Sequence, residues 1–136
     1  MDIEQAREFL RTHHRAVLVT RRSSGDPQLS PVAVAVDGEG RAVISTRETA
    51  MKTANLRRDP RASVCVMSDE FYGDWMQIDG RVEVVSLPDA MEPLVDYYRS
   101  VAGEHPDWDD YRAAMERERR VIVRMQIERA GPDRSG

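Results

Sequence analysis

The only lysine of the chain, Lys52, lies in the segment TAMKTANLRRDPRASV, which covers residues 49–64. Lysine and arginine together number 20, so the other 19 are arginines. Lys52 and Asn55 are three residues apart and therefore share one face of a short helix predicted at about 49–58. An ammonium beside the free amides at the start of a helix can bind an anion, and a phosphate monoester would suit it.

Two hydroxyl residues precede this helix. Ser45 and Thr46 come at the end of a predicted strand, 41–47, so their side chains can lie near Lys52. Leu56 can anchor the helix to the rest of the fold. On helix geometry alone the same residues fit an ordinary solvated surface helix, and a lysine near a serine is weak evidence for a binding site.

The composition limits the classes of function. The chain has 136 residues, a net charge of −4 and one cysteine, Cys65. This length suits one globular domain, and the negative balance argues against a dedicated nucleic-acid binder. No apolar run is long enough to span a membrane, no Cys/His spacing indicates a metal site, and the N-terminal segment does not resemble a signal peptide. We therefore expect a cytoplasmic protein without nucleic-acid or membrane partners, with Cys65 as an inert core residue.

The hydrophobic pattern predicts about six strands in short hairpins with helices around them. Short turns join the first three strands, which favours antiparallel pairing because parallel strands need crossovers of about a dozen residues. Closing such a sheet into a small barrel removes its exposed edges. The predicted domain covers residues 1–128, and 129–136 form a polar tail. Predicted helices are 3–12, 49–58, a segment from Pro88 to Gly103 and one from Pro106; predicted strands are 15–20, 28–37, 41–47, 61–67, 75–86 and 120–127.

Several segments together resemble one known family. The runs are KTANLRRDPRASV with VIST and DPQLSPVAV before it, and YRSVAGEHPDWDDYRAAM with RRVIVRM after it. They are similar to the split β-barrel flavoproteins of the pyridoxamine 5′-phosphate oxidase type, above all to the actinobacterial branch that uses the deazaflavin coenzyme F420. The resemblance covers residues 10–127. It implies a mainly β fold, a six-stranded antiparallel split β-barrel with peripheral helices.

The resemblance also implies a set of cofactor-binding residues. Gln28, Ser30, Pro31 and Val32 match the strand that lines the cofactor ring. The segment around the phosphate and ribityl chain is matched by Ser45, Thr46, Met51, Lys52 and Asn55. Tyr72 and Trp75 match residues that the second subunit contributes, since the family binds its cofactor between two protomers. Arg120 matches an arginine near the cofactor.

The implied activity is transfer of a hydride between reduced F420 and a small organic substrate, in a homodimer without a metal. The cofactor carries that chemistry, so no side chain is assigned as acid or base. Two alternatives stay open, an FMN-binding flavin reductase or oxidase of the same fold and a cofactor-binding protein without turnover. The carboxylate tail of F420 would need cations beyond the phosphate, and the sequence offers Arg57, Arg58 and Arg61, with Arg21 and Arg22 on a nearby turn.

Overall fold

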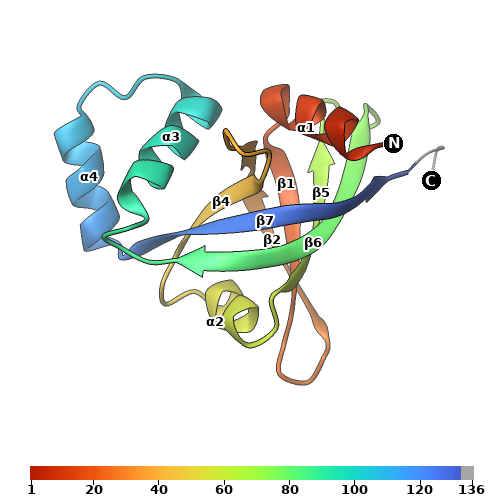
Figure 1. The fold of residues 1–136 in the computed structure, drawn as a ribbon, viewed down its shortest axis with the longest axis horizontal. Helices are drawn as coiled ribbons and strands as arrows, with labels where there is room; N and C mark the ends of the chain where they lie inside the picture. The colour runs from red at the N-terminus through yellow and green to blue at the C-terminus, as the bar shows by residue number, and fades with distance from the viewer. Residues whose placement is uncertain (133–136) are drawn as a thin grey trace.

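The computed structural model describes residues 1–132. One antiparallel sheet of seven strands curls around a core, in the order β2-β1-β5-β6-β7-β4-β3, with four helices around it (Figure 1). The elements are α1 (Ile3–Thr12), β1 (Arg15–Arg21), β2 (Pro27–Ala33), β3 (Ala35–Val36), β4 (Ala42–Arg47), α2 (Met51–Arg58), β5 (Arg61–Met67), β6 (Trp75–Val85), α3 (Met91–Ala102), α4 (Trp108–Arg117) and β7 (Arg120–Gly131). The predicted split β-barrel with peripheral helices is confirmed.

The strand count is seven rather than six because the predicted strand 28–37 divides at Val34. Its first part, β2, pairs only with β1, and its second part, β3, pairs only with β4. The chain therefore passes from one edge of the sheet to the other within one residue. Val34 is fully buried there, and its amide donates to the His14 carbonyl at 2.9 Å. The alternation of apolar residues in the sequence continues through this crossing, so the pattern did not reveal the break at Val34.

Two apolar clusters hold the fold together. Alternate residues of the strands fill the barrel interior, among them Leu18, Val64 and Ile78, each at most 1% exposed. The second cluster lies between the sheet and the pair α3–α4, and is centred on Leu94 and Ile122. A fully buried side chain of this size contributes about 1.5–3 kcal/mol. Both faces of β4 are consequently buried, one against each cluster.

The helix ends follow local signals in the sequence. Asp2 and Gln5 form a reciprocal capping box at the start of α1. Gly103 follows α3 with φ +83°, a conformation that favours glycine, and Asp107 caps α4 through the Asp110 amide. The α3–α4 pair covers one side of the barrel, while α1 and α2 lie at its opposite ends (Figure 1).

The last strand extends further than the sequence pattern indicated. Residues 128–131 were assigned largely to the polar tail, but β7 continues to Gly131 and pairs there with the first part of β6. The register shifts between Asp79 and Gly80, so Glu128 is the extra residue of a β-bulge. The long strand β6 supplies pairing partners that a local pattern cannot reveal. Residues 133–136 of the predicted tail lie outside the described residues.

The outer face of β1, β5 and β6 carries no helix. Cys65 lies there, half-buried, rather than in the core, because Val64 and Val66 take the inward positions of β5. Burial raises the pKa of its thiol, which agrees with a poorly reactive group. Within residues 1–132, no helix is long and apolar enough to cross a membrane.

Candidate functional site

Lys52 reaches from the first turn of α2 to the edge strand β2. Its Nζ donates to the Ser30 hydroxyl at 3.3 Å. The ammonium is half-buried, and burial, with a smaller contribution from the positive charge of Arg120, lowers the pKa of Lys52 below its usual 10.5. A cation held in this way, with a neighbouring cation and a hydroxyl, forms a site for an anion.

Asn55 supports this contact from inside the fold. It is 1% exposed, and its Nδ2 donates to Thr20 Oγ1 and to Gln28 Oε1, both at 3.1 Å. Its own carbonyl oxygen accepts a hydrogen bond from Arg58 at 3.2 Å. The side chain is thus committed to internal partners. Sequence reasoning placed Asn55 among the cofactor contacts, whereas the geometry gives it the task of positioning Gln28 and the strand that carries Ser30.

Arg120 lies at the start of β7, where it is held by Glu118. Its Nε and Nη2 donate to Glu118 Oε1 at 3.1 and 2.8 Å. Arg47, at the end of β4, donates to the same oxygen at 3.2 Å. The hydrogen bond from Arg120 is the main cause of a lowered pKa at Glu118. The carboxylate thereby fixes the arginine beside Lys52 and remains ionised.

The two hydroxyl residues of β4 point in different directions. Thr46 is 2% exposed and shares the inward side of the strand with Ile44. Ser45 is half-buried on the opposite side, which β4 turns toward α3. Of the two, only Ser45 lies on the side of the sheet that carries Ile122 and Arg120.

Tyr97 belongs to the same neighbourhood, although sequence reasoning did not select it. Its hydroxyl donates to the Ala33 carbonyl at 2.9 Å. Burial raises the pKa of Tyr97, while the Ser45 backbone and the charge of Arg120 act in the opposite direction. Tyr97 follows Leu94, a core residue of α3, by three residues, and this helical spacing was the signal available in the sequence.

The other predicted residues of β2 and α2 line the approach to Lys52. Val32 packs against the barrel core, on the same side of β2 as Ser30, whereas Pro31 is exposed on the other side. Met51, at the first position of α2, is 59% exposed. Alternation along β2 therefore separates Pro31 from the other three residues that were predicted to line a ring.

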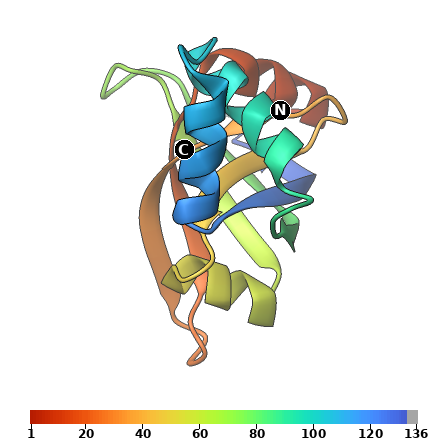
Figure 2. The ribbon, with the colours of Figure 1, turned by 90° about the vertical axis from the view of Figure 1, so that its left-hand side faces the viewer.

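Tyr72 and Trp75 do not join this cluster within one chain. Tyr72 is 95% exposed in the loop after β5, which projects from the body of the protein (Figure 2). Trp75, 43% exposed, lies opposite Met67 on the outer face of the sheet. Their exposure is compatible with the predicted role in a second subunit's site, and that role stays a prediction.

Three of the arginines expected to hold a carboxylate tail have partners inside the chain. Arg57 donates to both oxygens of Glu48, at 2.7 and 2.9 Å. Arg58 donates to the Arg21 carbonyl and to Asn55. Hydrogen bonds from Arg61 lower the pKa of Asp59 to about 2. Among the described residues, only Arg21 and Arg22 of this group make no side-chain hydrogen bond or ion pair.

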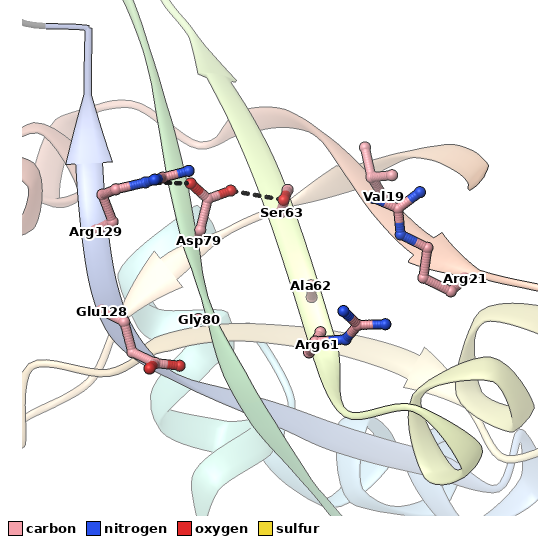
Figure 3. A pocket seen from close by; sticks show the side chains of 9 residues that line it. All are labelled: Val19, Arg21, Arg61, Ala62, Ser63, Asp79, Gly80, Glu128 and Arg129. Atoms are coloured by element: carbon pink, nitrogen blue, oxygen red, sulfur yellow. Dashed lines mark hydrogen bonds and ion pairs between the residues drawn. The ribbon is translucent and has the colours of Figure 1, made fainter. Parts of the chain in front are cut away.

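A hollow of about 390 Å³ opens on the outer face of the sheet (Figure 3). Asp79 lies at its centre, and accepts from Ser63 at 2.6 Å and from Arg129 at 3.3 Å. Burial raises the pKa of Asp79, but these hydrogen bonds outweigh it and lower the pKa. None of the residues predicted to meet the cofactor ring or phosphate lines it, but Arg21 and Arg61, two of the arginines proposed for the carboxylate tail, do. Its lining residues are Val19, Arg21, Arg61, Ala62, Ser63, Asp79, Gly80, Glu128 and Arg129.

The comparison with known families agrees with the barrel fold. The profile of the family described as "Pyridoxamine 5'-phosphate oxidase" matches residues 3–131, nearly the whole chain. The chain belongs to the pyridoxamine 5′-phosphate oxidase family. The predicted family is thereby confirmed.

Solved structures of this fold are similar over most of the chain. A conserved hypothetical protein of Mycobacterium tuberculosis is 23% identical, with a TM-score of 0.75, and the match covers 100% of this chain and 92% of that one. An F420 reductase is 21% identical, with a TM-score of 0.70 and coverage of 91% and 94%. A heme-binding protein of Mycobacterium smegmatis is 21% identical, with a TM-score of 0.68 and coverage of 97% and 55%. At these identities the likeness establishes the fold.

The internal role of Asn55 can be tested by Asn55→Ala. The change removes the donor to the buried Thr20 Oγ1 and one of the two donors to Gln28 Oε1, which then keeps only the Thr20 hydroxyl, so we expect the free energy of unfolding to fall by about 1–3 kcal/mol. The exposed neighbour Ala54 provides the control, because Ala54→Ser should change it by less than about 0.5 kcal/mol. Urea unfolding measures both. Unchanged stability combined with weaker flavin binding would instead make Asn55 a direct ligand contact.

Proposed function

We propose that this protein is an oxidoreductase that binds coenzyme F420 beside Lys52 and transfers a hydride between it and a small organic substrate. The observation that carries the proposal is the contact of the Lys52 ammonium with Ser30, next to Arg120, at the unpaired edge of β2. Membership of the pyridoxamine 5′-phosphate oxidase family supports a phosphorylated redox cofactor at this place.

The residues present fit the phosphate of such a cofactor. Lys52 supplies a compact charge, Ser30 a hydroxyl donor, and Arg120 a second cation already oriented by Glu118. Because the positive charge of Arg120 contributes to the lowered pKa of Lys52, an anion between the two cations would relieve their repulsion. A bound reduced deazaflavin supplies the hydride, and the chain's own residues bind and orient the cofactor.

The choice between F420 and FMN rests on fewer observations than the location of the site. The structural similarity to an F420 reductase supports F420, whereas the family as a whole equally supports FMN, which makes a flavin reductase or oxidase the second candidate. F420 continues past its phosphate into a carboxylate tail. Since Arg57, Arg58 and Arg61 are already paired, Arg21 and Arg22 are the remaining cations of the predicted tail site. Exposed pairs of this kind contribute only about 0–1 kcal/mol each.

We further propose that a second copy of the chain covers the outer face of β1, β5 and β6 and completes the site. Met67, Trp75 and Leu29 are exposed on this face, by 36%, 43% and 61%. Tyr72, in the projecting loop, is nearly fully exposed. Isolated exposed apolar residues are common, but a group of them on one uncovered sheet face is typical of an interface. A two-fold axis would bring each projecting loop to the partner's site.

Titration of the purified protein with F420 and with FMN tests the proposed function. We expect F420 to bind more tightly at low salt, and its advantage to shrink as salt rises, because exposed carboxylate–arginine pairs are screened. The advantage should be at most about tenfold, given the small contribution of such pairs. If FMN binds as tightly as F420 at low salt, the FMN alternative replaces the deazaflavin assignment. If neither binds, the proposed function is wrong.

The lowered pKa of Lys52 predicts how cofactor binding depends on pH. The ammonium of Lys52 should lose its proton at a lower pH than that of free lysine, whose pKa is 10.5. Cofactor affinity should therefore be highest below the lowered pKa. It should fall as the pH rises through that pKa, at a pH below 10.5. The phosphate charge is already complete above about pH 7. FMN or F420 dissociation constants from about pH 7.5 to 10 measure the fall, because phosphate and arginine do not titrate in that range.

Two substitutions serve as controls for this pH dependence. Lys52→Arg keeps a charge that does not titrate below about pH 12, so binding should be independent of pH in this range. Lys52→Ala should weaken binding by about 1.5–3 kcal/mol at neutral pH and also remove the fall. A wild-type profile as flat as that of Lys52→Arg would show that the ammonium does not contact the phosphate.

The dimer is tested by a charge placed on the proposed interface. Met67→Glu should convert a dimer at micromolar concentration into a monomer of about half the mass and weaken cofactor binding together with it, because a carboxylate would be buried unpaired. Ser100→Glu, on the exposed side of α3, is the matched control and should leave the mass unchanged. Sedimentation measures both. A wild-type chain that sediments as a monomer of 15.5 kDa would contradict the interfacial site.

A further inference from the structure

The barrel has an opening between β2 and β4 where no backbone ladder joins the two strands. β2 pairs only with β1, and β3 covers only Ala42 and Val43 of β4. Residues 44–47 of β4 therefore have no strand partner on their second edge within residues 1–132. The width of this opening must be set by side chains.

Tyr97 spans the opening from the side of α3. Its hydroxyl donates to the carbonyl of Ala33, the last residue of β2, at 2.9 Å. Tyr97 also packs against the apolar cluster that contains Val43 of β4, and the Ser45 backbone acts to lower the phenol's pKa. Tyr97 is thus bonded to β2 and packed against the cluster that includes β4, the two strands that the sheet leaves unjoined.

The contact of Tyr97 differs from those that α2 makes with β2. Lys52 and Asn55 reach the side chains of Ser30 and Gln28, so rotation of either side chain can release the strand. Tyr97 bonds to the backbone itself, at the point where the chain leaves β2 for β3. Ser30 lies between this point and Gln28, and its position depends on both ends of the strand.

We propose that Tyr97 is a positioning residue, which holds β2 at a fixed separation from β4 and thereby places Ser30 and the free edge of β2 against a bound ring. This rests on the proposed function for the identity of the ring, but the restraint on β2 is a property of the protein without cofactor. The phenol touches no reacting atom in this role, and its hydroxyl acts through Ala33.

The neighbouring tyrosines provide matched controls. Tyr98, the next residue on α3, packs in a ring cluster with His105, Trp108 and Tyr111, and its hydroxyl has no hydrogen-bond partner among the described residues. Tyr111 donates to the Leu94 carbonyl at 2.8 Å, a bond within the α3–α4 pair. Replacement of each by phenylalanine removes one hydroxyl from the same apolar cluster without affecting the opening.

Hydrogen–deuterium exchange of the cofactor-free protein is the first test. In Tyr97→Phe, amides of residues 28–36 should exchange about five- to tenfold faster, the effect of one lost hydrogen bond on a local opening. Tyr98→Phe and Tyr111→Phe should leave those rates unchanged. Incorporation of 4-aminophenylalanine at position 97, whose amine can donate to Ala33, should restore slow exchange. Unchanged rates in residues 28–36, or an equal increase in every strand, would overturn the proposal.

Binding of FMN and of riboflavin, which lacks the phosphate, is the second test. Tyr97→Phe should weaken both by the same factor, about three- to tenfold, because it displaces the edge that meets the ring. Lys52→Ala should weaken FMN alone. Faster exchange in β2 with unchanged affinity for both flavins would show that Tyr97 restrains the strand without positioning a ligand. If the wild type binds neither F420 nor a flavin while exchange responds as expected, the proposed function fails and the restraint on β2 stands.

Discussion

The fold depends on one constraint, the passage of the chain from one edge of the sheet to the other at Val34. β2 and β3 are consecutive in sequence, yet they lie at opposite ends of a seven-stranded sheet. The sheet must therefore curl until its two edges approach each other, but β3 is only two residues long and cannot close the ladder. The opening that results exposes backbone groups of β2 beside β4. Since β1, β5, β6 and β7 each pair on both sides, the free edge of β2 is a place where backbone groups can offer hydrogen bonds to a ligand.

The polar network around α2 follows from that constraint. A buried amide, Asn55, satisfies Thr20 and Gln28 and so fixes the end of β2 that the backbone ladder leaves free on one side. Burial of such a group is favourable only when its partners are complete, and here all of them are internal. Lys52 then extends along the same opening. Its environment is preformed by residues that a ligand need not contact.

Burial of the Lys52 ammonium costs folding free energy, and nothing offsets this cost in the cofactor-free protein. Because the pKa of Lys52 is lower in the folded chain than in the unfolded one, the unfolded state binds more protons between the two values. Stability of the cofactor-free protein should therefore rise with pH across that interval. Charged binding sites in general cost folding free energy in the absence of their ligand, and a bound anion offsets that cost. Within residues 1–132, Lys52 has no carboxylate partner, whereas Arg57 is paired with Glu48 and Arg61 with Asp59.

Local signals in the sequence predicted the elements well, whereas long-range partners decided the rest. The capping pair of Asp2 and Gln5, the glycine after α3 and the alternation at the start of β6 are readable within ten residues, and the structure has them. The break at Val34 and the extension of β7 to Gly131 depend on which strand lies alongside. The misplacement of Cys65 had a different cause, since a continuous apolar run conceals which residues face inward.

The site shows the same division between local and distant information. Lys52 and Ser30, both selected by resemblance, are in contact, and Arg120 contributes to the lowered pKa of Lys52. The internal partners of Asn55, Thr20 and Gln28, could not be read from the sequence because they are 35 and 27 residues away. Tyr97 was missed for the same reason, since its partner Ala33 is 64 residues distant. The residues that shape the opening thus make hydrogen bonds across long stretches of chain. A ligand at this edge would meet side chains whose positions are set by the whole barrel. In our proposal, what can bind there therefore depends on the separation of β2 from β4 rather than on any one contact.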